Sequence, residues 1–198
     1  GFDGIDINMG CPDKKVLKQG AGAALINNPK LAQEIIRQTK KGAGSLPVSI
    51  KTRIGYDKYD KKEFKKWLTV LLEAKPAVIT IHGRTKKEMS LVPAHWDIIA
   101  EAVKIRNKFD NSKNKTLILG NGDVKSVGDA EEKAKMSGVD GVMIGRAVFG
   151  NPWLFSESRP CQEPTKPVTV AGRLSTLLEH TKLFEKINKG LNFDVMKK

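Results

Sequence analysis

Short apolar runs of five or six residues alternate along the chain with longer segments whose apolar residues recur every three or four positions. The short runs have the length and β-branched content of strands, whereas the longer segments have the spacing of a helical face. The expected strands are Gly4–Asn8, Pro47–Lys51, Ala77–His82, Thr116–Gly120 and Gly141–Gly145. Regular alternation of strand and helix predicts right-handed crossovers and a parallel sheet.

Four amphipathic helices are expected in this alternation. They cover Pro29–Lys40, Asp60–Glu73, Trp96–Phe109 and Ser126–Met136. Five strands suit either an open, doubly wound sheet or the later part of a (β/α)8 TIM barrel, which needs eight strands and about 250 residues. Several strands show little alternation of polar residues, which predicts that both faces of the sheet are covered.

The composition changes after residue 155. Residues 156–168 are polar and rich in proline, which predicts a linker. An amphipathic helix is expected next, over Thr169–Ile187, with Val170, Leu174, Leu177, Leu178, Thr181, Phe184 and Ile187 on one face. The 198 residues are therefore divided into a main domain at 1–155, the linker, and a helical segment at 169–198.

The charge balance is strongly basic, with 35 Lys and Arg against 22 Asp and Glu and a net charge of +13. This surplus favours a polyanion, nucleic acid above all, although a lysine-rich solvated surface gives the same total. Two cysteines make no disulfide framework, so the cytoplasm is the expected location. The sequence contains no apolar run near the roughly 20 residues of a membrane helix and no secretory leader. A first residue of Gly indicates an incomplete chain.

All five expected strands are followed by polar or glycine-rich sequence, at the ends where parallel α/β proteins bind ligands. Together these residues predict a lined active site, and the glycine before an expected helix start at residue 146 suits an anion. No CxxC pair or HExxH motif is present, so no metal site is expected. The candidates, in chain order, are Asn8, Cys11, Lys51, Arg53, His82, Arg84, Asn121, Gly122, Asp123, Gly145 and Arg146.

Each candidate taken alone also has a structural interpretation. Cys11 could be a small buried residue, and Lys51 a side chain that reaches water. His82 could be a core histidine, and Asn121–Asp123 only a turn. These alternatives stay open for single residues. Three further residues have no convergent neighbours and are interpreted as structural or surface residues: His95, Cys161 and His180.

Six stretches within residues 4–155 carry these strand ends: DINMGCP, GAGAALINNP, VSIKTRIG, ITIHGRT, LGNGDV and GVMIGRAVFGNPWLF. In this order they resemble the tRNA-dihydrouridine synthase family. FDVMKK at the end of the chain resembles the start of a motif in that family's C-terminal helical domain. The resemblance implies an FMN-binding TIM barrel, here strands four to eight only, followed by the beginning of the helical tRNA-binding domain.

The resemblance also implies a reaction. The family reduces the carbon 5–carbon 6 double bond of uridines in tRNA with FMN, which NADPH (or NADH) reduces. Cys11 would be the general acid that protonates carbon 5, with Lys51 and His82 beside the flavin ring. The other implied cofactor contacts, to the ribityl and phosphate groups, are Asn121, Gly122, Asp123, Gly145 and Arg146, and the weaker implied substrate contacts are Asn8, Arg53 and Arg84. The expected partner is tRNA, with no membrane and no obligate protein partner, so a monomer is expected.

Two alternatives remain beside this hypothesis. One is another FMN barrel oxidoreductase, such as a dihydroorotate dehydrogenase, and the other is a noncatalytic RNA-binding fragment. The second is favoured by the absence of the first three barrel strands, which implies that the chain alone neither closes the barrel nor completes a flavin site. The segment Met89–Trp96 also differs from the aromatic-glycine segment of many relatives, so the tRNA position is not predicted.

Overall fold

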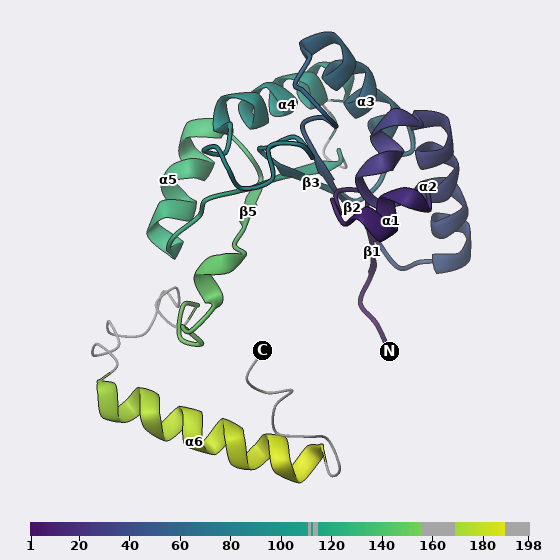
Figure 1. Ribbon diagram of the computed structural model, residues 1–198. Helices are drawn as coiled ribbons and strands as arrows, with labels where there is room; N and C mark the ends of the chain where they lie inside the picture. Colours follow the sequence, from purple (N-terminus) through teal and green to yellow (C-terminus); the bar gives the residue numbers. More distant parts are fainter. Residues whose placement is uncertain (111, 113–114, 156–168, 189–198) are drawn as a thin grey trace. The chain divides into compact units, whose positions relative to one another are not determined.

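A computed structural model describes residues 1–110, 112, 115–155 and 169–188 of the chain (Figure 1). The chain divides into two compact units, Gly1–Leu154 and Phe155–Lys198. The expected linker at 156–168, with Cys161, and the FDVMKK stretch at 193–198 lie outside the described residues.

The first unit contains a sheet of five parallel strands, in the order β1-β2-β3-β4-β5. Each strand therefore pairs with the strand that follows it in the chain. A doubly wound sheet reverses its direction, whereas a barrel is wound in one direction only, so the strand order favours the barrel architecture. The bounds of β1 to β5 are Ile5–Asn8, Val48–Arg53, Val78–His82, Leu117–Asn121 and Gly141–Met143.

The long helices of the first unit lie along one face of this sheet (Figure 1). The second helix packs on the third, the third on the fourth and the fourth on the fifth. Their bounds are Pro29–Ala43 (α2), Lys61–Glu73 (α3), Trp96–Phe109 (α4) and Val127–Ser137 (α5). This one-sided cover also fits a barrel, because a doubly wound sheet carries helices on both faces.

The predicted strands and long helices are confirmed, with shifts at their ends. Strand β2 runs on to Arg53 and β4 to Asn121, so both site candidates belong to strands. Strand β5 ends at Met143, two residues before the expected end. Three short elements have too few residues for a periodic pattern and were not predicted: α1 (Lys14–Lys18), η1 (Gly22–Asn27) and η2 (Arg146–Val148).

Alternate strand residues face opposite sides of the sheet, and only one side is buried against the helices. The buried side carries Ile50, Ile79 and Ile118, each with no exposed surface, and they pack in one cluster with the apolar faces of α3 and α4. The other side is covered unevenly, since Leu117 is 42% exposed and Thr80 only 2%. The expectation that both faces are covered is therefore met only in part in the described residues of the first unit.

Side-chain caps explain where the long helices begin. Asp60 Oδ1 accepts the backbone N–H groups of Lys62 and Glu63 at 2.9 and 3.0 Å, and this fixes the start of α3. Ser126 Oγ accepts the N–H of Asp129 at 3.1 Å at the start of α5. These caps end the loops that follow β2 and β4, which carry site candidates.

The described part of the second unit contains helix α6, Val170–Ile187, close to the expected Thr169–Ile187. Thr169 Oγ1 caps it by accepting the N–H of Gly172 at 3.1 Å. Several apolar side chains of its expected face are well exposed, namely Val170, Leu174, Leu177, Leu178 and Ile187. Among the described residues, no helix is both long and apolar enough to cross a membrane.

Candidate active site

A row of polar residues crosses the sheet where its strands end. The register pairs Arg53 with His82 and His82 with Asn121, so three neighbouring strands bring these side chains to one face. Two positions before Arg53 in β2, Lys51 lies on the same face beside Asn8 of β1. This face is opposite the apolar cluster. The sheet thus gathers five candidates that are far apart in the sequence.

A hollow of about 770 Å³ lies at these strand ends. Pro12, next to Cys11, contributes to its wall, as do Met89 and Ser90 of the loop after β3. Cys11, Asn8 and Lys51 are not among its lining residues. Eight of the eleven candidates line it: Arg53, His82, Arg84, Asn121, Gly122, Asp123, Gly145 and Arg146.

Two arginines and a carboxylate link three strand ends inside the hollow. Arg84, only 3% exposed, donates from Nη2 to Asp123 Oδ2 at 2.5 Å. Arg146 donates from Nη2 to the other oxygen, Asp123 Oδ1, at 3.0 Å. Burial opposes ionisation of Asp123, but the Arg84 and Ala94 N–H hydrogen bonds and the two arginine charges outweigh it. They hold the pKa of Asp123 below its ordinary value.

His82 is held neutral by its surroundings. Burial, and then the nearby charges of Arg53, Lys51 and Arg84, lower its pKa to about 3 against the opposing charge of Asp123. Arg84 Nη1 lies 3.4 Å from His82 Nε2. An arginine can only donate, so this contact favours an imidazole whose Nε2 accepts and whose Nδ1 carries the proton. Such a ring forms hydrogen bonds but holds no charge at neutral pH.

Lys51 is the second titratable group whose pKa is far from its ordinary value. Burial, and then repulsion from Arg53, lower the pKa of Lys51 to about 8 against the opposing charge of Asp6. Arg53 also has a lowered pKa, because of burial and then the charge of Arg84. Its guanidinium donates to Gly10 O at 2.7 Å and Thr85 O at 3.1 Å, which joins the ends of β1, β2 and β3.

The loop that carries Cys11 is anchored on both sides. Asn8 Oδ1 accepts the N–H groups of Gly10 and Cys11, each at 3.0 Å, and Ala23 N–H donates to Cys11 O at 3.0 Å. A Cβ at Gly22 would lie 2.8 Å from Cys11 O, and Gly22 has φ +60°. Gly22 is a residue that sequence reasoning did not assign, although the GAG triplet around it was part of a matched stretch.

Trp96 was also missed as a residue of the site. Its ring lies under β4, where a Cβ at Gly120 would be 2.4 Å from Cζ3, and its Nε1 donates to Gly122 O at 3.0 Å. The indole therefore supports the turn at Asn121–Asp123. The sequence predicted Trp96 only as the first residue of a helix. The two glycines of LGNG were the available signal that a large side chain packs against this turn.

The expectation that a helix starts after Gly145 is wrong. The element there, η2, is a 3-10 turn of three residues, too short to supply the free N–H groups and dipole of an α-helix. Anion binding near Gly145 would therefore depend on the side chain of Arg146.

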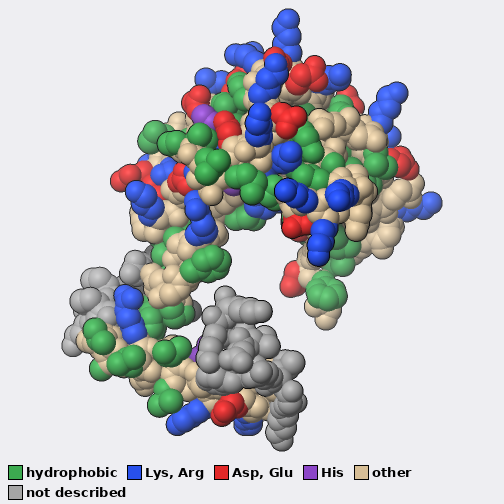
Figure 2. Space-filling model, in the orientation of Figure 1, with side chains coloured by type: hydrophobic (Ala, Val, Ile, Leu, Met, Phe, Trp, Pro, Cys, Tyr) green, Lys and Arg blue, Asp and Glu red, His purple; other side chains and the backbone are tan. Residues whose placement is uncertain are grey.

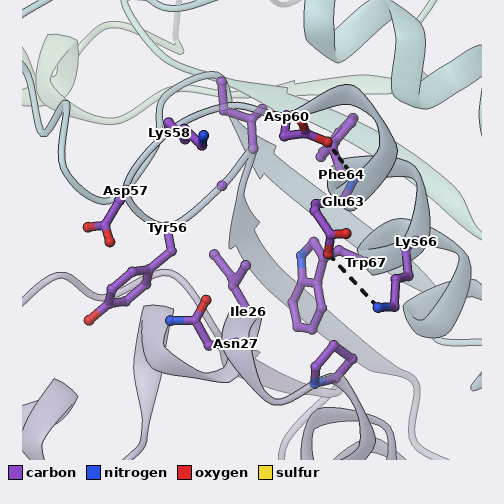
Figure 3. Close-up of a pocket in the computed structure, with 13 residues that line it drawn as sticks. Ile26, Asn27, Tyr56, Asp57, Lys58, Asp60, Glu63, Phe64, Lys66 and Trp67 are labelled. Carbon is purple, nitrogen blue, oxygen red and sulfur yellow. Dashed lines mark hydrogen bonds and ion pairs between the residues drawn. The ribbon is translucent and has the colours of Figure 1, made fainter.

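A second hollow, of about 240 Å³, lies between η1, the loop after β2 and α3 (Figure 3). Three of its polar side chains have structural partners: Asp60 caps α3, Trp67 Nε1 donates to Thr52 Oγ1 at 3.2 Å, and Glu63 lies 4.0 Å from Lys66. Sequence reasoning placed no candidate here. In the described residues, no three His, Cys, Asp or Glu side chains are grouped as metal ligands would be.

The one-directional parallel sheet and the polar row at its carboxyl ends define an α/β protein with the strand order of a barrel and a candidate ligand site at the strand ends. The chain matches the family model "Dihydrouridine synthase (Dus)" over residues 1–195. It belongs to the dihydrouridine synthase family.

Curated relatives agree with this membership. The chain is 47% identical over 189 residues to "Probable tRNA-dihydrouridine synthase" of Staphylococcus aureus and 42% identical to "Probable tRNA-dihydrouridine synthase 2" of Bacillus subtilis. Each alignment covers 96% of this chain and 54% of the relative, so the chain spans about half the length of these curated relatives.

Solved structures give a likeness of fold alone. Two crystal structures of 2,3-dimethylmalate lyase, a PEP mutase/isocitrate lyase superfamily member, have TM-scores of 0.55 and 0.52 and identities of 13% and 12%. The two alignments cover 98% of this chain, and 79% and 76% of the respective lyase chains.

Proposed function

We propose that a protein carrying this chain uses FMN to reduce the carbon 5–carbon 6 double bond of uridines in tRNA. The observation that carries the proposal is the row of Arg53, His82 and Asn121 across the strand ends, beside Lys51, in a member of the dihydrouridine synthase family. Strands β1 to β5 would be barrel strands four to eight, which is consistent with a chain that spans about half of its relatives.

The strand-end hollow fits a flavin nucleotide in size and charge. Its volume is about 770 Å³, within the usual range of small-ligand sites, and its wall joins cationic groups to apolar ones such as Met89 and Val124. The ribityl and phosphate contacts we propose are Asn121, Gly122, Asp123, Gly145 and Arg146, with Lys51 and His82 beside the ring. When bound, FMN would supply the hydride for carbon 6 of uracil after reduction by NADPH or NADH.

The chain's own residues would control the proton and the charge. Cys11 Sγ would give its proton to carbon 5 and regain one from solvent, so that hydride and proton together saturate the bond. Lys51, with a pKa of about 8, is mostly positive at neutral pH and would favour negative charge beside it. His82 is neutral and would orient the ring or the base by hydrogen bonding.

We propose tRNA as the macromolecular partner. The net charge of +13 suits a phosphate backbone, and Figure 2 shows Lys and Arg side chains spread over the visible face of the first unit. The second unit, with α6, would belong to the helical tRNA-binding domain. The target uridine would have to leave its stacked position to reach the hollow. Asn8, Arg53 and Arg84 are the weaker candidates for substrate contact, and the cytoplasm is the proposed location.

One experiment tests the proposed function. The full-length protein is incubated with FMN, NADPH and tRNA that lacks dihydrouridine, and the nucleosides are analysed by mass spectrometry. We expect dihydrouridine to form. Turnover of free orotate without dihydrouridine would instead support a dihydroorotate-dehydrogenase-like enzyme, and tRNA binding without flavin would support a noncatalytic RNA-binding protein.

The chain as written gives a second test. Residues 1–198 alone are expected to bind FMN weakly, because the proposed alignment leaves out the first flavin-contacting loop of the barrel. Stoichiometric, tight FMN in this purified chain, seen as flavin absorbance after gel filtration, would contradict the assignment of β1 to β5 as strands four to eight.

A further inference from the structure

We propose that Arg84 and Asp123 are a positioning pair, which aims the guanidinium of Arg146 at the anionic end of the ligand in the strand-end hollow. Neither member of the pair would contact the ligand itself through its charged group. This inference rests on the proposed function, since it takes the ligand to be a flavin phosphate. It changes the expected roles of two residues: Arg84 was a substrate candidate and Asp123 a direct cofactor contact.

The surroundings of Arg84 leave its charged group little capacity for a ligand. Its side chain is 4% exposed, and all three guanidinium nitrogens have a protein neighbour. Nε donates to Val92 O at 2.5 Å, Nη2 donates to Asp123 Oδ2 at 2.5 Å, and Nη1 lies 3.4 Å from His82 Nε2. A buried arginine that is paired in this way is a structural cation, because separating it from its carboxylate would leave a buried charge uncompensated.

Asp123 is suited to hold an arginine and unsuited to hold a phosphate. Oδ2 accepts from Arg84 and from Ala94 N–H, the latter at 2.9 Å, and Oδ1 accepts from Arg146. A carboxylate beside a phosphate would add repulsion between like charges.

The backbone at Asp123 also favours this role. Asp123 adopts φ +51° and the preceding Gly122 φ +131°, where a Cβ would lie 2.6 Å from Ala94 Cβ. The turn is thus held in a conformation that directs the carboxylate to both arginines.

Arg146 has the exposure that Arg84 lacks. Its side chain is 66% exposed, and it lines the same hollow. A free arginine side chain samples many rotamers, and ordering it on binding costs free energy. The hydrogen bond from Nη2 to Asp123 at 3.0 Å restricts the guanidinium before the ligand arrives, and its other N–H groups suit the paired contacts that phosphates make with arginine.

The test compares two ligands that differ only in the phosphate. FMN and riboflavin are titrated separately into the full-length apoprotein, and the quenching of flavin fluorescence gives both dissociation constants. Asp123→Asn keeps the size of the side chain and removes its charge. We expect it to weaken FMN binding about tenfold, as the loss of a charge-assisted hydrogen bond would, and to leave riboflavin binding within about twofold.

Three further variants separate positioning from general damage. Arg84→Lys keeps the positive charge but removes the planar guanidinium and its several N–H donors. We expect it also to lower the preference for FMN over riboflavin. Arg146→Gln should lower that preference directly, and adding Asp123→Asn to it should cause no further loss, because both changes remove one interaction. Asp140→Asn is the matched control: Asp140 accepts from Arg106 at 2.7 Å, does not line the hollow, and should leave the preference unchanged.

The outcomes are distinct. Equal weakening of FMN and riboflavin by Asp123→Asn would make its role general stability and overturn the inference. An unchanged preference in Asp123→Asn, beside a lowered one in Arg146→Gln, would overturn it as well. Absence of any flavin binding by the parent protein would overturn the proposed function and this inference with it.

Discussion

The two hollows of the first unit contain similar kinds of residue but differ in how those residues are held. The larger one receives side chains from the ends of three neighbouring strands, and the smaller one is formed by η1, the loop after β2 and α3 (Figure 3). In the larger hollow the charged groups lie close enough to shift one another's pKa, as at His82 and Arg53. In the smaller one, the Glu63 and Lys66 charges lie 4.0 Å apart and are mostly exposed to water.

This difference distinguishes a candidate ligand site from a group of solvated surface charges. Strand ends bring several polar groups to one place without a side chain having to stretch, so their charges interact in a partly buried setting. The helix cap Asp60 and the exposed pair of Glu63 and Lys66 are also charged, but exposed charges of this kind interact mainly with water. The predictions below either sharpen this contrast or would remove it.

The largest effect is expected from Cys11→Ala in the full-length protein. Removing the proposed acid should lower the rate of uridine reduction about 10²- to 10⁴-fold, while NADPH still reduces the flavin. Single-turnover reduction of tRNA and stopped-flow reduction of flavin measure the two steps separately. Cys161→Ala, which removes the other thiol of the chain, serves as control. Equal uridine reduction by Cys11→Ala and the parent protein would remove Cys11 from the acid role.

A large effect is also expected from Gly22→Ala, which acts on the Cys11 loop without touching the thiol. The new methyl would lie 2.8 Å from Cys11 O, at a residue with φ +60°, so the loop must move. We expect uridine reduction to fall about tenfold or more, since small misplacements of catalytic groups have such costs.

Gly42 provides the matched control for this substitution. It lies within α2, and a Cβ added there would point into open space. Gly42→Ala should raise the free energy of unfolding by up to about 1 kcal/mol and leave the reduction rate unchanged. A rate in Gly22→Ala equal to that of Gly42→Ala would show that the loop tolerates displacement.

The next effect concerns acid stability and His82. The imidazole has a pKa of about 3 in the folded chain and about 6.5 when unfolded, so between these values only the unfolded chain binds the proton. Its contribution therefore leaves stability intact above pH 6.5 and lowers it progressively as the pH falls toward 3. His82→Asn should flatten this part of the profile.

Urea unfolding of parent and variant from pH 7 to pH 4 measures the effect as a difference. The comparison is needed because carboxylates such as Asp123 and Asp140, whose pKa values lie below the ordinary range, also lose stabilising contacts in acid. If stability fell equally steeply with pH in the two proteins, folding would not lower the pKa of His82. The neutral imidazole in the folded chain would then be disproved.

The alternation of strands and helices, and the polar residues at the strand ends, were predictable because both depend on local sequence. The periodic residues of α3, such as Phe64 and Leu68, and the apolar runs of β2 and β3 determine the elements, and parallel strands bring their carboxyl ends together. The same local pattern placed His82 correctly at the end of β3, whereas Lys51 lies two residues before the end of β2. The one-sided cover of the sheet was not predictable from apolar runs, because they do not say which neighbour buries each face.

The contacts within the site depend on pairs distant in sequence. Arg84 and Asp123 are 39 residues apart, and the register of β3 with β4 decides that they meet. Gly22 likewise depends on a close approach to Cys11 that no propensity encodes. A sequence names candidate residues; whether one of them touches a ligand or supports another residue depends on its partners in space.

The smallest effect is expected in the second hollow. Lys66→Gln removes an exposed charge whose ammonium lies 4.0 Å from Glu63, and such pairs contribute little in water. We expect the free energy of unfolding to change by less than about 0.5 kcal/mol and FMN affinity to remain within twofold, about the error of a titration. Urea unfolding and flavin titration give both values, with Arg146→Gln as the comparison in the strand-end hollow. If Lys66→Gln weakened FMN binding as much as Arg146→Gln, the two hollows would be parts of one electrostatic site. The strand ends alone would then no longer explain where the ligand binds.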